Sequence, residues 1–224
     1  MNKFFTLIFM FVVLSPGMLS AAPGEGYAEG FEYKLVTPAQ PTTGKGMVEV
    51  VEMFWYGCPH CFKFEPILNE WLKTKPKNVK FVRVPAIFRP QWELHAQLFY
   101  TAEALGIADK LHQQVFDAIH KERINLSDEK SIRTFFVKHG VKAEDFDRTF
   151  RSFSVLAKVR RARMLTSRYG INVVPSMIVN GKYMTDARIA SLGDTGITHQ
   201  NMLKVVDFLI ARESSAGDVT TGNK

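Results

Sequence analysis

The sequence predicts an α/β fold in which two separated parts of the chain share one sheet and a block of helices is inserted between them. Apolar strand patterns occupy 48–54 and 79–84, only helical periodicity is found from about 91 to 169, and strand patterns return at 176–184. A sheet of two strands is rarely stable alone, so we expect the two halves to pair in a single sheet.

The first residues predict a secretory signal peptide. Lys3 precedes the apolar run Phe4–Leu14, and small residues follow as far as Ala22. The run is shorter than the ~20 residues that cross a bilayer, and no later stretch is long and apolar enough to do so. We therefore expect residues 1–22 to be removed and the mature protein to be soluble and exported.

The mature chain is expected to contain two domains and a tail. The sheet domain takes residues 23–88 and 170–212, and the helical domain takes 89–169. Residues 213–224 are small and polar, and we expect them to be disordered.

Val48–Phe54 is expected to be a central strand, because its nearly continuous apolar character is interrupted only by Glu49 and Glu52. The period then changes to that of a helix, which is expected to begin at Pro59 and to place Cys61 on its apolar face.

The other elements follow from their end signals. Five helices are expected in the inserted block, at 92–105, 108–121, 127–140, 143–153 and 155–169. Asn180–Gly181 between two short strands is typical of a β-hairpin turn. A short strand at 31–36 and a final helix at 201–211 complete the prediction.

The chain is basic, with a net charge of +7, or +6 without Lys3. Much of that charge lies in one predicted helix, in Lys158, Arg160, Arg161, Arg163 and Arg168. Such a run is usually a solvated helix face, and no nucleic-acid-binding motif accompanies it, so we expect no nucleic-acid partner. Attraction to anionic lipid headgroups or to acidic unfolded chains stays open.

The only two cysteines are Cys58 and Cys61, three positions apart at the predicted start of a helix. The unpaired N–H groups and the positive dipole end there favour thiolate, so the pKa of Cys58 should be depressed. We expect Cys58 to be the exposed, attackable sulfur and Cys61 to be its buried partner. Half of a zinc site is the alternative, but no second ligand pair has a suitable spacing, so we expect no metal and no cofactor.

Three further groups are expected to support this pair. His60 lies between the cysteines and can place a positive charge or an N–H donor beside the thiolate. Val174–Pro175 precedes a strand, and a cis bond there, although uncommon for an X–Pro bond, would turn the Val174 backbone toward a ligand.

The carboxyl groups of Glu52 and Glu65 form the third group. If they are buried, their pKa values should rise and they could relay protons to Cys61; the alternative is that both face solvent. Arg83, on the neighbouring predicted strand, could be a charge partner for either.

Together these residues resemble the DsbA family of thiol:disulfide interchange proteins, within the thioredoxin superfamily. The resemblance covers about residues 30–212 and rests on Glu52-x-Phe54, Cys58-Pro59-His60-Cys61, Phe64-Glu65, and Val174-Pro175-x-Met177-x-Val179-Asn180-Gly181-Lys182-Tyr183. It implies a thioredoxin-like fold with an inserted helical domain.

The resemblance also implies roles for single residues. Cys58 would be the nucleophile, Cys61 its disulfide partner, and His60 the main stabiliser of the thiolate. Val174–Pro175 would be the cis-proline loop. Glu52 and Glu65 would be the buried acidic pair, in which Arg83 stands where the family often has a lysine.

The resemblance favours a monomeric periplasmic dithiol oxidase that gives its disulfide to reduced, unfolded exported proteins and is reoxidised by a DsbB-like, quinone-linked membrane protein. A disulfide reductase or isomerase is a second hypothesis, although only about 25 residues precede the predicted fold, too few for a dimerisation domain. A non-catalytic holdase that uses apolar surface near Phe62 is a third.

Overall fold

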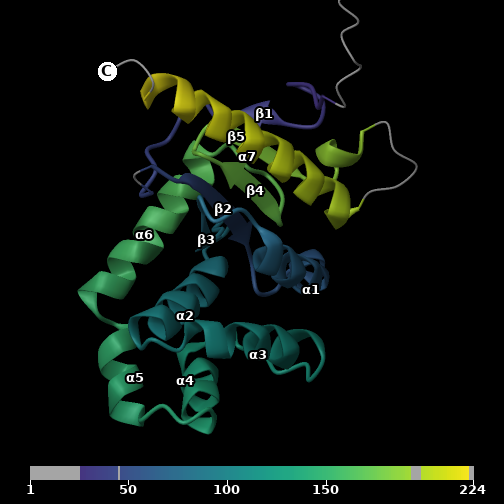
Figure 1. The fold of residues 1–224 in the computed structure, drawn as a ribbon. Coiled ribbons are helices and arrows are strands. Elements are labelled where there is room, and N and C mark those ends of the chain that lie inside the picture. Colours follow the sequence, from purple (N-terminus) through teal and green to yellow (C-terminus); the bar gives the residue numbers. More distant parts are fainter. Residues whose placement is uncertain (1–25, 45, 193–197, 222–224) are drawn as a thin grey trace, which may run out of the picture.

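The computed structural model describes residues 26–44, 46–192 and 198–221. The predicted signal peptide, 1–22, lies outside these residues. Within them the chain forms one five-stranded sheet with helices packed on both sides (Figure 1).

The sheet joins the two separated halves, as predicted. Its strand order is β1-β5-β4-β2-β3, with bounds β1 Lys34–Leu35, β2 Val48–Phe54, β3 Val79–Pro85, β4 Ser176–Val179 and β5 Tyr183–Asp186. Strand β2 pairs in parallel with β3 and antiparallel with β4. Every residue of β2 is buried, which agrees with a central strand covered on both faces.

Two groups of helices cover the sheet. Helix α1 (Pro59–Thr74) and helix α7 (His199–Thr221) pack together on one face (Figure 1). The block inserted between β3 and β4 contains α2 (Trp92–Ala104), α3 (Ala108–His120), α4 (Glu129–Lys138), α5 (Ala143–Phe150) and α6 (Phe153–Arg168). A short 3-10 helix, η1 (Ile189–Ser191), follows β5. The residue limits of the two domains stay a prediction.

The alternation of β2 side chains divides the core into two clusters. Val50 packs with Leu68 and Val206 on the α1 and α7 side. Val51 and Met53 belong to a larger cluster that extends into the inserted helices. Cys58 follows β2 and the turn after it. It therefore lies at the boundary between the sheet and the helical block.

The predicted hairpin is present and its turn is formed by the Asn180–Gly181 dipeptide. Both residues have positive φ, 50° and 64°, which is the geometry of the turn that best matches the twist of paired strands. The carbonyl of Gly181 accepts a hydrogen bond from the Gln40 N–H at 2.9 Å. A Cβ at position 181 would overlap the Gln40 backbone, so only glycine fits there.

Several boundaries differ from the prediction. The first strand keeps only Lys34–Leu35 of the expected 31–36. The cap of α4 is Asp128 rather than Ser127, because the Asp128 carboxylate accepts the Ser131 N–H at 2.8 Å. Helix α5 ends at Phe150, since Ser152 caps the next helix.

The final helix is longer than predicted, and α7 continues to Thr221 through most of the segment expected to be disordered. Glu213 anchors this extension because its carboxylate accepts hydrogen bonds from Asn180, from Lys182 Nζ at 2.7 Å and from the Tyr183 hydroxyl at 3.1 Å. The Ser214 hydroxyl donates to the Ile210 carbonyl at 2.9 Å, so it is satisfied within the helix. Composition alone indicated disorder because it does not report this anchor.

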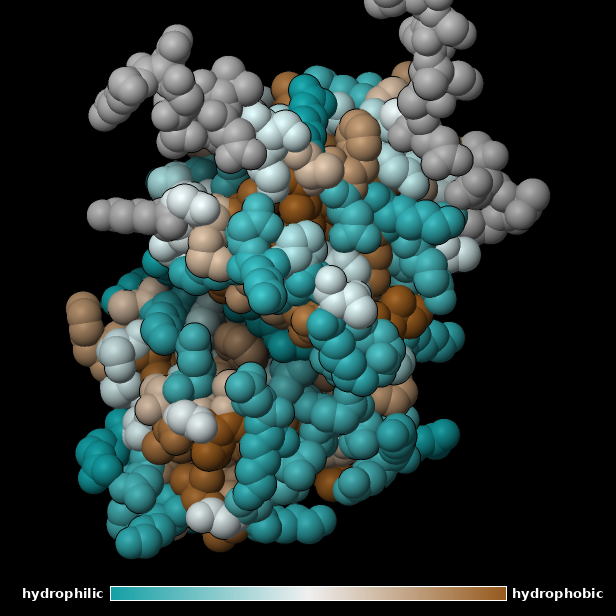
Figure 2. All heavy atoms as spheres, viewed as in Figure 1, coloured by the Kyte–Doolittle hydropathy of each residue, from teal (hydrophilic) through white to brown (hydrophobic). Residues whose placement is uncertain are grey.

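No helix among the described residues combines the length and the apolar character needed to cross a membrane. Polar side chains cover most of the face drawn in Figure 2, and apolar ones gather over the region of α4 and α5.

Candidate active site at the start of helix α1

Cys58 is the N-cap of α1, and Pro59 occupies the first helical position. The Cys61 N–H donates to Cys58 Sγ at 3.4 Å, so the sulfur takes the position that a capping oxygen usually takes. Both cysteines are free thiols in this structure. Cys61 is fully buried, and Cys58 is the cysteine that retains some exposure to solvent, as predicted.

Cys58 is less exposed than the sequence indicates, at 8% of its surface. The thiol donates to the Val174 carbonyl at 3.4 Å, so the loop before β4 covers part of the sulfur. The Val174–Pro175 bond is cis, as the resemblance implies. The sulfur is therefore held between a helix end and a backbone carbonyl from a distant part of the chain.

The ionisation of the two thiols is driven in opposite directions. The hydrogen bond from the Cys61 side chain, with backbone N–H groups of Cys61 and His60, lowers the pKa of Cys58 from 9.0 to about 6. Burial raises the pKa of Cys61 well above 9.0. At neutral pH the reduced site therefore holds one thiolate, on Cys58, and one thiol, on Cys61.

His60 contributes less to lowering the pKa of Cys58 than the resemblance implies. Its side chain is exposed, and its charge is the weakest of the named influences on the pKa of Cys58. Its ring centroid lies 6.5 Å from that of His199, the first residue of α7. The side chain of Cys61 and the backbone of the first helical turn outweigh the imidazole, because they reach the sulfur by hydrogen bonds.

Aromatic packing fixes the loop before the cysteines. The Cys58 N–H donates to the Trp55 carbonyl at 2.9 Å, and the Trp55 ring stacks on Trp92 with centroids 4.0 Å apart. A Cβ on Gly57 would overlap the Trp55 ring, so the glycine lets the indole fold back over the turn. The loop is thereby tied to helix α2 of the inserted block.

Glu52 and Glu65 are both fully buried, which decides between the two alternatives left open by the sequence. Arg83 lies between them. Its Nε is 3.2 Å from Glu52 Oε2, and its Nη2 is 3.2 Å from Glu65 Oε2. The register of the sheet explains the first contact, since Glu52 and Arg83 are directly paired across β2 and β3. Arg83 therefore takes part in the acidic network.

His112 is a member of this network that the sequence analysis missed. It comes from α3, and its Nε2 lies 2.9 Å from Glu65 Oε1. Its other ring nitrogen, Nδ1, lies 2.9 Å from the Tyr56 hydroxyl. His112 precedes Phe116 by one helical turn, on the apolar side of α3, and this position is the signal that could have revealed a buried histidine.

The two acidic residues differ in protonation. Burial, together with the nearby Glu65 charge, raises the pKa of Glu52 from 4.5 to about 8. Burial acts in the same direction on Glu65, but the His112 hydrogen bond and the Arg83 charge outweigh it and hold the pKa of Glu65 below its ordinary value. At neutral pH Glu52 is a carboxylic acid and Glu65 is a carboxylate.

The network is electrostatically linked to the cysteines, because the charge of Glu52 is among the influences that raise the pKa of Cys61. A carboxylic acid with a pKa near neutral pH can deliver or receive a proton there. Among the described residues, no group of three or more His, Cys, Asp and Glu side chains is placed to hold a metal ion.

A low-pKa thiolate at a helix N-terminus, backed by a buried thiol, is suited to nucleophilic exchange with disulfides. Together with the sheet order and the Val174–Pro175 loop, it defines a thiol:disulfide oxidoreductase of the thioredoxin-like class.

Comparison with known proteins specifies the family. The family described as DSBA-like thioredoxin domain matches residues 83–193, and a thioredoxin domain family like that of thioredoxin domain-containing protein 17 matches residues 53–111. The thiol:disulfide interchange protein DsbA of Pseudomonas syringae pv. tomato is 41% identical over 198 residues, 88% of this chain and 90% of the relative. That of Azotobacter vinelandii is 42% identical over 187 residues, 84% and 85% of the two chains.

Solved structures agree. The crystal structure of Pseudomonas aeruginosa DsbA has a TM-score of 0.78 and 39% identity, covering 86% of this chain and 97% of that one. The chain belongs to the DsbA family of thiol:disulfide interchange proteins, and it is an oxidoreductase of that type.

Proposed function

We propose that this protein is a periplasmic dithiol oxidase that passes a disulfide between Cys58 and Cys61 to newly exported proteins. The observation that carries the proposal is the opposed ionisation of the two thiols, with the pKa of Cys58 lowered to about 6 and that of Cys61 raised. A thiolate on Cys58 stabilises the reduced enzyme relative to its disulfide form, so the disulfide is readily given away.

The exchange takes two displacements. A substrate thiolate attacks Cys58 Sγ of the oxidised enzyme, which forms a mixed disulfide and breaks the bond to Cys61. Cys61 leaves with the electron pair and takes a proton. A second substrate thiolate attacks the substrate sulfur of the mixed disulfide, and Cys58 leaves as a thiolate. The substrate has lost two electrons and two thiol protons, and the enzyme has gained two electrons.

Glu52 has the properties of the proton donor to Cys61 in the first displacement. It is fully buried and protonated at neutral pH, and its ionised form raises the pKa of Cys61. Arg83, whose Nε lies 3.2 Å from the Glu52 carboxyl group, would then stabilise the negative charge that Glu52 acquires, while the ionised Glu65 favours return of the proton.

Pro59 and Val174–Pro175 have positioning roles in this proposal. Pro59 starts α1 without needing a hydrogen-bond partner for its missing N–H. The Val174 carbonyl lies 3.4 Å from the reactive sulfur, within reach of a backbone N–H from an extended substrate chain. The clients are reduced, unfolded polypeptides, the enzyme acts as a monomer, and a DsbB-like membrane protein accepts its electrons.

The test is oxidation of a reduced, unfolded protein by the purified, oxidised enzyme. We expect one substrate disulfide per enzyme disulfide consumed, and no reaction with Cys58→Ser. The redox state of Cys58 and Cys61 in cells decides the direction of net disulfide transfer. A mostly oxidised pair supports the oxidase, and a mostly reduced pair would assign the protein to the reductases or isomerases. Full activity of the Cys58→Ser, Cys61→Ser double variant in preventing aggregation would instead favour a holdase.

A further inference from the structure

Helix α6 has an outward face that the thiol chemistry does not use. Residues separated by three, seven and eleven positions lie on one side of a helix, and the four at these positions from the start of α6 are Phe153, Leu156, Arg160 and Met164. We call these four residues the outer α6 face. The side of α6 turned to the protein is formed by Val155, Val159, Ala162 and Thr166, all buried.

The outer α6 face carries three exposed apolar side chains, and Phe153 is the most exposed large apolar side chain among the described residues. Phe153 is 81% exposed, Met164 is 41% exposed and Leu156 is 36% exposed. Tan and brown spheres interrupt the polar surface along the left edge of Figure 2, where Figure 1 places α6. A phenylalanine this exposed leaves apolar surface in water, so a partner that covered it would gain the free energy of burying that surface.

Positive charge accompanies these apolar groups. The sixteen residues of α6 include five cationic side chains and no Asp or Glu, so no acid within the helix neutralises them. Lys158 pairs with Glu103 at 2.8 Å, and Arg163 pairs with Glu93, both from α2. Arg160 lies over the Phe153 ring at 5.7 Å from its centroid, which leaves the guanidinium at the outer α6 face.

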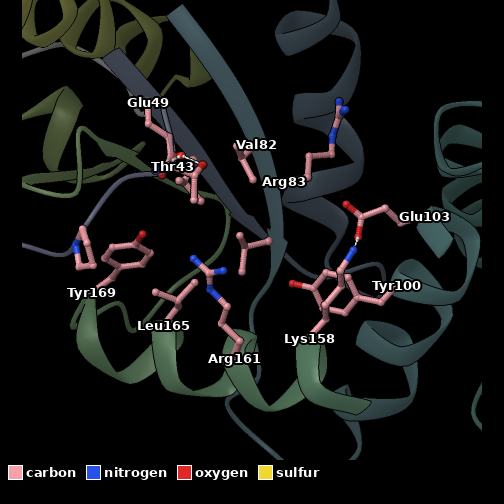
Figure 3. Close-up of a pocket in the computed structure, with 13 residues that line it drawn as sticks. Thr43, Glu49, Val82, Arg83, Tyr100, Glu103, Lys158, Arg161, Leu165 and Tyr169 are labelled. Carbon is pink, nitrogen blue, oxygen red and sulfur yellow. Dashed lines mark hydrogen bonds and ion pairs between the residues drawn. The ribbon is translucent and has the colours of Figure 1, made fainter. Parts of the chain in front are cut away.

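The other cations of α6 point elsewhere. Figure 3 shows Lys158, Arg161 and Leu165 directed from α6 toward a hollow of about 160 Å³ that reaches β2 and β3. The outer α6 face is therefore a separate surface, with Arg160 as its central charge. Arg163 and Arg168 lie at its margins, and Arg168 Nη1 reaches Gln40 at 3.5 Å.

We propose that the outer α6 face docks on an anionic lipid headgroup layer. Its apolar side chains are spread over about 16 Å of helix and separated by a guanidinium, rather than joined in one patch of the kind that fits a protein groove. A headgroup layer accepts this arrangement, because arginine stays at the phosphates while Phe153, Leu156 and Met164 enter the acyl boundary. Charge complementarity selects anionic lipid over neutral lipid.

An ordinary solvated helix face explains the observations less well. Such a face carries acids one turn from its cations and few large apolar groups. The outer α6 face has no acidic residue of its own helix beside its cation, and it carries three exposed large apolar side chains. The proposal is independent of the direction of thiol exchange, since it involves none of the residues around Cys58.

The test is co-sedimentation of the protein, purified from cells expressing the full chain, with vesicles of phosphatidylcholine alone or mixed with phosphatidylglycerol. The double variant Phe153→Ser, Arg160→Glu is compared with Val137→Ser, Lys130→Glu on α4, where Val137 is 43% exposed. Both doubles change the net charge equally and remove one exposed apolar side chain. All proteins share the same N-terminal residues, so a difference between them reports on α6.

We expect binding to the phosphatidylglycerol vesicles that weakens with added salt. The α6 double should bind about tenfold less tightly, and the α4 double should match the wild type. Thiol exchange should be unchanged in both, which shows that they are folded. Absence of binding to anionic vesicles, or equal losses in the two doubles, would overturn the proposal.

Two other outcomes would also contradict it by identifying a different occupant. One is a dimer in sedimentation velocity that Phe153→Ser converts to a monomer, which would mean that a second copy covers this face. The other is binding to an unfolded acidic polypeptide, sensitive to Arg160→Glu, without binding to vesicles.

Discussion

His112 and Glu65 share a hydrogen bond of 2.9 Å that orders the whole buried network. Burial lowers the pKa of His112, so its ring is neutral at pH 7. A neutral imidazole donates from one nitrogen and accepts at the other, so Nε2–H donates to Glu65 and the Tyr56 hydroxyl donates to Nδ1, 2.9 Å away. Tyr56, His112 and Glu65 thus form one directed chain of hydrogen bonds that ends at a carboxylate.

We predict that His112→Ala destabilises the protein by about 3 kcal/mol, because it leaves a buried carboxylate and a buried hydroxyl with one partner fewer and also removes packing volume. Denaturant unfolding of the reduced protein measures this change. The substitution should also raise the pKa of Glu65, so the loss of stability should vary with pH. His112→Gln, which retains a donor, should recover part of the loss; equal losses in the two variants would show that only packing matters.

Glu52→Gln should stabilise the protein at neutral pH by on the order of 2 kcal/mol. The pKa of Glu52 is raised from 4.5 to about 8, so between these values the unfolded state releases a proton that the folded state retains. Folding stability therefore falls as pH rises through this window, and glutamine removes the dependence. Unfolding measured from pH 4 to pH 9 should show no advantage of the variant below about 4.5, an advantage that grows up to about pH 8, and a constant advantage above that. A constant difference would contradict the raised pKa.

The reduction potential should change its pH dependence near pH 6. Below the Cys58 pKa of about 6 reduction takes up two protons, and above it only one, because Cys58 remains a thiolate. The slope should change from about 59 to about 30 mV per pH unit as pH rises. Equilibration with glutathione at each pH measures it, and thiolate absorbance gives the same pKa independently. A break near pH 9 would mean that Cys58 ionises as an ordinary cysteine.

His60→Ala should raise the pKa of Cys58 by less than about one unit, because the stronger influences come from Cys61 and the backbone of the first helical turn. The same thiolate titration measures the change. A rise to the ordinary value of 9.0 would restore His60 as the main stabiliser.

The end of α7 offers a prediction about stability. A chain ending after residue 215 should be more stable than one ending after residue 212 by about 2 kcal/mol, because only the longer one retains Glu213 and its bonds to Lys182 and Tyr183. Glu213→Ala in the full chain should reproduce most of the loss. Equal stability of the two truncated chains would mean that the helix end is not anchored.

Much of the fold follows from local patterns. The continuous apolar run of β2, the shift of period at Pro59 and the Asn180–Gly181 turn are properties of neighbouring residues, and they predict the elements well. Glu52 was recognisable because a carboxylate interrupts an otherwise apolar strand. These signals need no knowledge of distant contacts.

The remainder depends on contacts across the fold. His112 reaches Glu65 over 47 positions of sequence, and the Cys58 thiol meets Val174 over 116. Neither separation leaves a local pattern. The stability of the α7 end likewise comes from Glu213 bonding to the β4–β5 hairpin, whereas its composition indicates disorder. Local sequence patterns therefore indicate the candidate reactive residues but do not report how these side chains are covered and paired.

The contact between Cys58 and Val174 has a consequence for the timing of catalysis. A neutral thiol can donate to the Val174 carbonyl, as it does across 3.4 Å, but a thiolate has no proton to donate and repels the oxygen. If Val174 has the positioning role proposed above, ionisation of the sulfur frees this carbonyl to accept an amide N–H from an arriving polypeptide. On that proposal a single proton controls both the reactivity of the sulfur and whether the Val174 carbonyl is free, so a chain would pair there only while the sulfur is charged or bonded to another sulfur.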